Sequence, residues 1–415
     1  MTSETVPPVA RVARPGRVVG DRRGGWLIEG TLATLPAWLA ARVLVGGLSW
    51  HLDPAHPLGK LFMWDTRWYL SIAKYGYDHG GILIHFFPAT SLGAAGLADV
   101  TRLPTTIALF AFCWAFALLF GALVHRMVVR ETGDRAAARR AAWLTQLAPG
   151  AFALVMGYTE PLAGALAVGY FLTVRGGGDS ERRSDDGVGS DGSAAGVGSL
   201  GDRRGLTIGR TSAAFALGFL GGMARPVGVL LAIPGAIEGI RHARAEDWSR
   251  SAVAKAVAVA LAPTAGLAAF LGYSRARYDS WMLPYTEQTN EKGRGTIMGD
   301  PIGILRRVWS HDPSRHGHEV AVMAAILILC FAVLLLVVSK RLPISYVAWT
   351  VPSYFLAIGS KYFTSLPRYL GALFPCLIAA ALITQRRWQW LAVLAASCLL
   401  LLWTTYLAFK GYAVA

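Results

Sequence analysis

The sequence predicts an all-α protein in which about eleven helices cross a membrane as one bundle. Hydrophobic residues occupy 54% of the 415 positions and charged residues only 16%, whereas soluble domains carry about 25% charged residues. Several apolar runs reach the ~20 residues that a helix needs to cross a bilayer, and the short alternating segments of a β-barrel are not evident. The candidate spans are residues 28–50, 104–126, 140–157, 160–174, 211–224, 226–240, 252–273, 319–339, 343–359, 367–384 and 388–409.

The arginines and lysines indicate how these spans are oriented. They are frequent in residues 1–26, before the first span, and then in every second connection between spans. Because cytoplasmic connections are enriched in Lys and Arg, we expect a multi-pass protein of the cell membrane with a cytoplasmic N-terminus and with residues 51–103 and 274–318 outside. The same distribution explains the net charge of +15, so a nucleic-acid partner is not expected.

Composition divides the chain into four stretches. Residues 1–26 are predicted to be a disordered basic tail, residues 27–175 the membrane catalytic part, and residues 206–415 a second membrane part. Between the two membrane parts, residues 176–205 are rich in Gly, Ser, Asp and Arg and contain no aromatic residue. Such a composition buries too little apolar surface to fold, so we expect a disordered cytoplasmic linker there.

The first outer connection is predicted to contain two surface helices. Apolar and aromatic residues recur at helical spacing over residues 61–75. This pattern indicates an amphipathic helix lying on the outer face of the bundle. Residues 88–100 are expected to form a second helix in the same connection.

Metal and cofactor sites find no support in the sequence. The four cysteines lie in apolar runs, and none has the spacing of metal ligands. The histidines of the first outer connection are irregularly spaced and form no zinc motif. We therefore expect no tight metal site and no cofactor. Since no nucleotide-binding motif occurs in a suitable context, an activated donor substrate would have to be held by a lipid tail and not by a base.

The most informative stretch is WDTRWY at residues 64–69, just after the first span. A carboxylate so close to hydrocarbon is a functional candidate, and flat rings beside an acid suit a sugar that stacks on them and gives up a hydroxyl proton. We therefore predict that Asp65 is a general base. The alternative is a surface helix on which Asp65 pairs with Arg67 or Lys60. Candidate substrate contacts in this stretch are Trp64, Arg67, Trp68 and Tyr69.

Isolated charges also occur at other positions that are predicted to be outside. Glu160 begins the second of two short spans, Arg225 lies between two apolar runs, and Arg368 lies one turn into a later span. A guanidinium in such surroundings needs a carboxylate or phosphate partner, so we predict that Arg225, Arg368 and Lys361 hold a lipid phosphate. Glu160 is expected to orient a hydroxyl or to hold Arg225; its alternative is a simple helix N-terminal acid. Further candidate substrate contacts are His85, Tyr158 and Tyr369.

Five short motifs follow one another along the chain. They are WDxxWY at residues 64–69, FFP at 86–88, GYTEPL at 157–162, ARPxG at 224–228 and SxPRY at 365–369. In this order the chain resembles the PIG-V-like mannosyltransferases (GPI mannosyltransferase II-like), membrane enzymes of the glycosyltransferase C (GT-C) superfamily. The resemblance implies a GT-C-like bundle with a catalytic acid in the first outer loop, which maps onto Asp65.

The resemblance also implies a reaction. A hexose, usually mannose, would pass from a polyprenyl-phosphate or dolichyl-phosphate donor to an extracytoplasmic acceptor, with inversion at the anomeric carbon. The acceptor would be a glycolipid, a glycan or a protein, and membrane lipid is the remaining expected partner. The alternative from another class is a polytopic lipid or small-molecule transporter, because short spans interrupted by Gly and Pro also occur at transporter sites. A transferase-like protein that binds lipid without catalysis is a third interpretation.

Overall fold

The computed structural model describes residues 25–78, 81–176, 206–289, 300–311, 315–359, 363 and 365–411. Every regular element within these ranges is helical, which confirms the predicted all-α class. Lys361 and most of the predicted tail and linker lie outside the described residues. The α-helices are α1 (Gly25–Leu52), α2 (Asp65–Tyr75), α3 (Ala89–Thr101), α4 (Thr105–Thr132), α5 (Arg135–Leu147), α6 (Glu160–Val174), α7 (Ile208–Ala224), α8 (Ala232–Ala245), α9 (Arg250–Tyr278), α10 (Leu283–Thr289), α11 (Pro301–His311), α12 (Arg315–Arg341), α13 (Ile344–Ile358), α14 (Leu366–Gly371), α15 (Phe374–Ile383) and α16 (Arg387–Phe409). Short 3-10 helices are η1 (Gly59–Phe62), η2 (Gly81–His85), η3 (Ala151–Leu154) and η5 (Pro226–Leu231).

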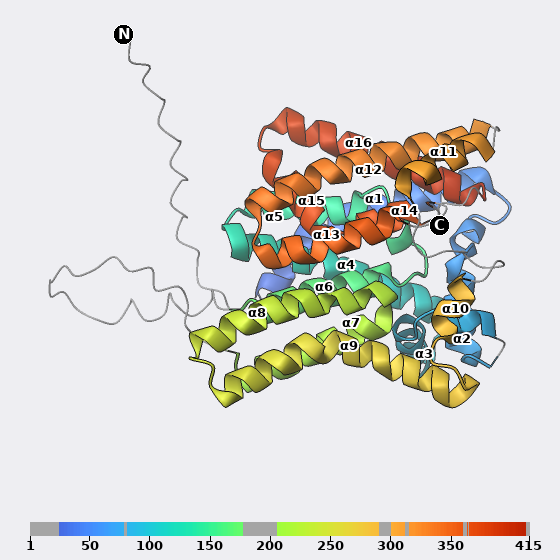
Figure 1. The fold of residues 1–415 in the computed structure, drawn as a ribbon. Coiled ribbons are helices and arrows are strands. Elements are labelled where there is room, and N and C mark those ends of the chain that lie inside the picture. The colour runs from blue at the N-terminus through green and yellow to red at the C-terminus, as the bar shows by residue number, and fades with distance from the viewer. Residues whose placement is uncertain are drawn as a thin grey trace, which may run out of the picture.

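The molecule is a bundle whose longest helices lie side by side (Figure 1). Five of the described helices, namely α1, α4, α9, α12 and α16, are long and apolar enough to cross a membrane. Shorter apolar helices, α6, α13 and α15, lie among them. Together with α5, α7 and α8, these helices correspond to the predicted spans.

Local sequence explains where the helices differ from the predicted spans. The span predicted at residues 140–157 is only partly α5. That helix starts earlier, because the Asp134 side chain accepts from the backbone N–H groups of Ala136 and Ala137, and it ends at Leu147, so the prediction is wrong for the residues after it, where η3 forms. The span predicted at residues 367–384 is divided into α14 and α15. Pro375 opens the second of these helices, where its missing N–H costs least.

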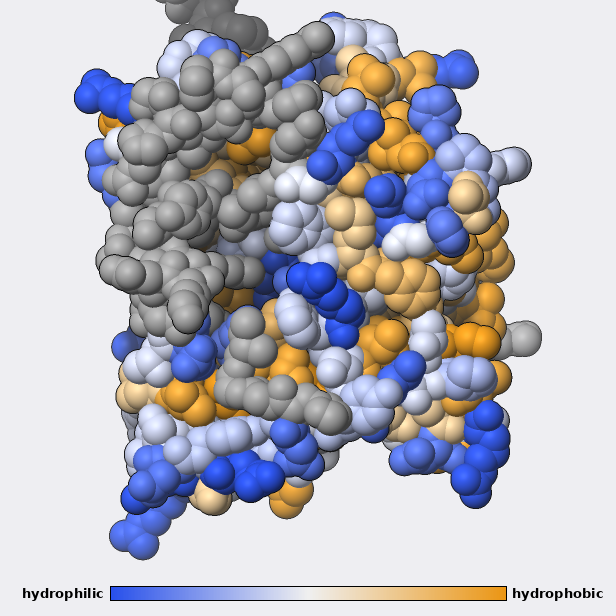
Figure 2. Space-filling model, turned by 90° about the vertical axis from the view of Figure 1, so that its right-hand side faces the viewer, coloured by the Kyte–Doolittle hydropathy of each residue, from blue (hydrophilic) through white to orange (hydrophobic). Residues whose placement is uncertain are grey.

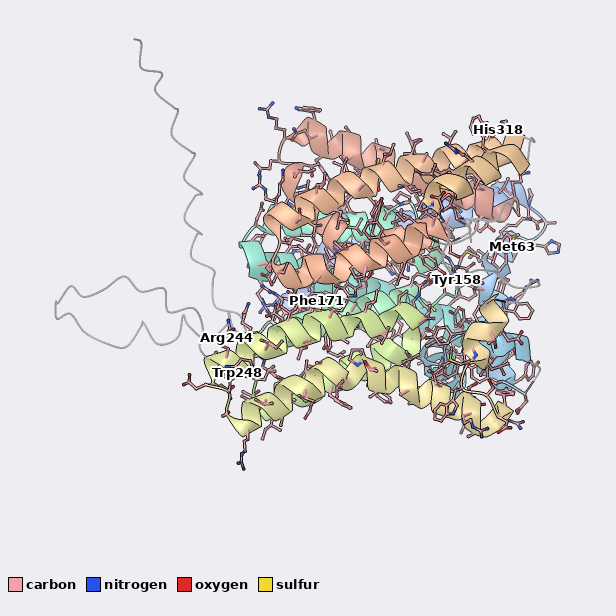
Figure 3. The ribbon with its side chains drawn as sticks, viewed as in Figure 1. Met63, Tyr158, Phe171, Arg244, Trp248 and His318 are labelled. Atoms are coloured by element: carbon pink, nitrogen blue, oxygen red, sulfur yellow. The ribbon has the colours of Figure 1, made fainter. Side chains whose placement is uncertain are left out.

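The connections separate into two ends of the bundle. Arg244 and Trp248, in the turn from α8 to α9, lie at one end, and Met63 and His318 lie at the other (Figure 3). The surface helices α2 and α3, which were predicted from residues 61–75 and 88–100, lie at the end of Met63 together with α10 (Figure 1). The connections that were predicted to share the outer side therefore do share one end of the molecule.

Aromatic packing fixes the surface helices onto the bundle. The Phe87 ring, just before α3, lies 4.8 Å from the ring of Phe270 in α9. The Tyr69 ring of α2 meets Phe86 edge-on at 5.3 Å, and the Ser91 hydroxyl of α3 donates to the Tyr69 carbonyl at 3.0 Å. Side chains in α2 are thereby held in a fixed position over the ends of the long helices.

A buried ion network joins four helices at the opposite end. The Arg175 guanidinium, directly after α6, donates to both carboxylate oxygens of Glu131 in α4, at 2.9 and 3.0 Å. It also donates to Glu238 in α8 at 2.6 Å, and Tyr346 of α13 donates to Glu131 at 3.0 Å. The network fixes one end of α6, and Glu160 begins the other end, ~21 Å away at 1.5 Å per residue.

Candidate active site

A cavity of about 370 Å³ lies where α2, η2, α6, η5, α13 and α14 meet. Its walls are mainly apolar, but polar side chains gather in one part of it. The end of the molecule that carries α2 presents a mixture of hydrophilic and hydrophobic surface (Figure 2). The polar lining residues are Asp65, Tyr69, His85, Thr159, Glu160, Arg225, Tyr285, Ser353, Ser365, Arg368 and Tyr369.

Asp65 is the first residue of α2, which places its carboxylate at a helix N-terminus, where negative charge is favoured. The preceding residue, Trp64, has φ of 56° and ψ of −129°, a backbone conformation that a non-glycine residue rarely adopts. Its indole N–H donates to the Ala408 carbonyl at 2.9 Å, which helps to hold this turn. Such strained positions are found at functional sites, where the surrounding structure enforces them. Trp64 therefore aims the Asp65 side chain.

Arg368 of α14 is the central cation of the site. Its Nη1 donates to Asp65 Oδ2 at 2.8 Å and lies 3.5 Å from Glu160 Oε1. Its Nη2 donates to the Ser365 hydroxyl at 2.6 Å, and its guanidinium lies 4.8 Å from the Tyr158 ring centroid. The side chain is only 3% exposed, so this arginine is fixed in position and poorly hydrated.

Arg225 is the second cation, and it lies in the sharp turn from α7 to η5. Its Nη1 is 3.1 Å from Glu160 Oε1, and its guanidinium lies 4.9 Å from the Tyr369 ring centroid. A Cβ on Gly228 would lie 2.0 Å from the Gly221 carbonyl oxygen, so only glycine lets this turn fold back onto α7. The ARPxG motif thus has a steric reason for its glycine.

The four charges form one connected group with no net charge. Asp65 and Glu160 provide two carboxylates, and Arg225 and Arg368 provide two guanidiniums, with Glu160 between the two arginines. Buried charges require such pairing because their desolvation is costly. Both arginines line the cavity, and guanidiniums in such a position can bind an anion.

Three other predicted contacts also line the cavity. Burial and the nearby carboxylates of Asp65 and Glu160 raise the pKa of Tyr69 above its ordinary value, so this phenol stays neutral and can donate a hydrogen bond. His85 lies with its ring 4.2 Å from the Phe86 ring. With Tyr369, these side chains provide flat surfaces and polar atoms beside the charged group.

The remaining predicted contacts take other positions. Trp64 and Tyr158 support Asp65 and Arg368 as described, and Arg67 is exposed, with its guanidinium 4.7 Å from the Trp68 ring centroid. None of these four residues lines the cavity within the part of the chain that the structure describes. Lys361 was also predicted to hold phosphate, and it lies outside that part.

Sequence reasoning missed several lining residues. Ser365 was visible in the SxPRY motif, but its bond to Arg368 was not expected. Tyr285 of α10, and Trp349 and Ser353 of α13, also line the cavity. No motif marks these three, and their participation follows only from the way in which α10 and α13 pack against the site.

The apolar part of the cavity is built largely from small side chains. Ala163, Gly164 and Ala167 share one face of α6, and Gly221 of α7 lies near them. Because these side chains are small, space for a ligand remains between the helices. An amphipathic molecule with an anionic head and an apolar chain fits such a cavity. Within the described ranges, no group of three or more His, Cys, Asp or Glu residues is arranged as metal ligands.

Comparison with known proteins gives distant structural likenesses. No protein-family model and no curated protein matches the chain. ArnT from Cupriavidus metallidurans, solved bound to undecaprenyl phosphate, is similar at 15% identity with a TM-score of 0.49, over 90% of this chain and 64% of its own. The archaeal oligosaccharyltransferase AglB from Archaeoglobus fulgidus, in complex with an inhibitory peptide and a dolichol-phosphate, is similar at 11% identity with a TM-score of 0.40, over 91% of this chain and 56% of its own. The chain therefore spans less than two thirds of the length of either structure.

Proposed function

We propose that this chain is a membrane glycosyltransferase that takes a sugar from a polyprenyl-phosphate donor and transfers it to an acceptor hydroxyl. The observation that carries the proposal is the contact between Asp65 and Arg368, with Arg225 close by, in a cavity whose other walls are mainly apolar. A general base and two phosphate-binding cations are the groups that this reaction requires. The apolar walls suit the isoprenoid chain.

Asp65 takes the acceptor proton in the proposed mechanism. The acceptor oxygen attacks the anomeric carbon from the face opposite the phosphate, and its proton passes to the Asp65 carboxylate. The bond between the anomeric carbon and the phosphate oxygen breaks, and the electron pair stays on the phosphate. Attack from the opposite face inverts the anomeric configuration. Positioned base catalysis of this kind contributes roughly 10²- to 10⁴-fold in rate.

The two arginines stabilise the leaving group. A lipid phosphodiester with one negative charge becomes a phosphomonoester with a second charge as the sugar departs. Arg225 and Arg368 lie where guanidinium donors meet that developing charge in a poorly hydrated site. Glu160 acts as a positioning residue in this proposal, because its carboxylate lies within 3.1 and 3.5 Å of the two cations.

The family resemblance supports the proposed sugar. We propose mannose as the transferred hexose, on the basis of the PIG-V-like motifs at residues 64–69, 224–228 and 365–369. The acceptor is a glycolipid, a glycan or a protein. The basic connections support an extracytoplasmic reaction at the end that carries α2.

A donor screen with purified full-length protein tests this function. Polyprenyl-phosphate mannose, polyprenyl-phosphate glucose and the nucleotide forms of both sugars are offered with a mixed glycan and glycolipid acceptor fraction. Transfer or slow hydrolysis of lipid-phosphate mannose, without use of nucleotide sugars, is the expected result. Use of nucleotide sugars alone contradicts the proposal. Uptake of sugar or lipid into vesicles without any transfer favours the transporter instead.

A further inference from the structure

A second cavity, of about 440 Å³, lies between the start of α1, the second half of α4, and α6 and α7. It is separated from the candidate active site by α6 itself. Ala163, Gly164 and Ala167 line the active-site cavity, whereas Ala165, Leu166 and Gly169 of the same helix line the second one. The second cavity therefore offers a binding site that the proposed reaction does not use.

One face of α4 forms a wall that is apolar along most of its length and basic at its end. Phe116, Leu119 and Leu123 are followed on the same face by Arg126 and Arg130, at spacings of three and four residues. At 1.5 Å per residue, this face extends for ~21 Å. An acyl chain in one leaflet must cover ~15 Å, which is half of the hydrocarbon core.

The two arginines line the cavity near the C-terminal end of α4. Arg130 Nη1 donates to the Leu172 carbonyl at 2.7 Å, and the Arg126 guanidinium lies 6.0 Å from the Trp26 ring centroid. Tryptophan is enriched at the level of lipid headgroups. A tryptophan beside Arg126 is therefore typical of the level at which lipid phosphates lie.

The charge around the cavity is positive. No acid occurs among the described residues that line it. Of the acids near the cavity, Glu131 binds Arg175, and Glu29 lies 3.2 Å from Arg135. An anionic headgroup is therefore favoured here over a zwitterionic one, as at other basic pockets between membrane helices.

We propose that this cavity is a binding site for an anionic membrane phospholipid. One acyl chain lies along the apolar face of α4 against α6 and α7, and the phosphate lies between Arg126 and Arg130. The apolar walls exclude a free anion as the natural occupant, because most of the cavity offers no polar partner.

Lipid retention by the full-length protein tests the site. The protein is exchanged into detergent with phosphatidylglycerol or phosphatidylcholine, and bound lipid is counted by native mass spectrometry. We expect retention of phosphatidylglycerol over phosphatidylcholine. The double variant R126Q/R130Q is expected to retain phosphatidylglycerol roughly thirty-fold less well, about five-fold per charge removed. The control R244Q/R250Q removes two exposed arginines on either side of the turn from α8 to α9 and is expected to behave as wild type.

A variant that fills the cavity distinguishes lipid binding in the cavity from attraction to surface charge. A Cβ on Gly169 meets only Leu217, at an ordinary contact distance of 3.5 Å, so Gly169→Leu is expected to fold and to occupy the cavity with both arginines kept. Loss of phosphatidylglycerol in this variant supports the site, and it remains informative if R126Q/R130Q fails to fold. Equal retention of the two lipids by wild type, equal loss in the two double variants, or full retention by Gly169→Leu would overturn the proposal.

Discussion

The two arginines of the candidate active site have different surroundings, and this decides which one reports on substrate. Arg368 is 3% exposed and contacts both carboxylates and Ser365, so its removal takes one cation away from two poorly hydrated carboxylates and threatens the fold. Arg225 contacts Glu160 and Tyr369, and its side chain is 11% exposed. Arg225 is therefore the better probe of donor binding.

Replacing Arg225 by Gln should weaken use of the lipid donor. Loss of charged hydrogen bonds to the phosphate, worth about 1.5–3 kcal/mol, corresponds to a roughly 10- to 100-fold lower kcat/KM for polyprenyl-phosphate sugar. The measurement is steady-state transfer at varied donor concentration. Arg277→Gln is the matched control, because Arg277 pairs with Asp78 on the surface. Equal kcat/KM in Arg225→Gln and wild type would show that Arg225 does not bind the donor phosphate.

The short helix α14 shows how one element positions the site. It brings Ser365 and Arg368 into the cavity, and it is held from behind by the turn at Gly150. A Cβ on Gly150 would lie 2.0 Å from the Pro367 carbonyl oxygen and 2.7 Å from the Arg368 Cα. No side chain fits between these two backbones.

Gly150→Ala should therefore displace α14 and move Arg368 away from Asp65. Overpacking of this kind costs about 1–3 kcal/mol, and transfer activity should fall with it. Thermal unfolding in detergent and the transfer rate are the two readouts. Gly47→Ala is the control, since nothing lies within 4 Å of that Cβ in α1. A Gly150→Ala protein with wild-type stability and activity would show that this turn does not position Arg368.

The sequence predicts the positions of the helices better than it predicts the interruptions within them. Long apolar runs predict the helices, and the positive-inside pattern predicts which connections lie at the same end of the bundle. The interruption between α14 and α15 was not foreseen, because Gly371 and Pro375 are both common in membrane helices. The interruption matters for function, since it lets Arg368 lie in a short helix next to Asp65 rather than within a continuous span.

At the scale of the whole molecule, topology brings the site together. Asp65, Glu160, Arg225 and Arg368 are far apart in sequence, but all were predicted in connections or at span ends on one side, so their meeting was expected. The network of Arg175, Glu131 and Glu238 was not expected. Charged residues at the predicted cytoplasmic ends of the helices were interpreted only through the positive-inside rule. Nothing in the sequence spacing indicated that they pair across helices.

The predicted orientation has a direct test. In a variant without native cysteines, Arg67→Cys at the α2 end and Arg244→Cys at the opposite end provide two exposed labelling sites. A membrane-impermeant maleimide should label Arg67→Cys in intact cells and Arg244→Cys only after permeabilisation. The reverse pattern would place the candidate active site on the cytoplasmic side and exclude an extracytoplasmic transferase.

The most direct test of the central claim is sugar transfer by Asp65→Asn in membranes supplied with labelled polyprenyl-phosphate mannose. Asparagine keeps the size of the side chain but cannot take the acceptor proton, so we predict a rate lower by roughly 10²- to 10⁴-fold. Asp78→Asn, at an exposed acid in the same connection, should transfer normally. Wild-type transfer by Asp65→Asn would contradict the role of this carboxylate as the catalytic base.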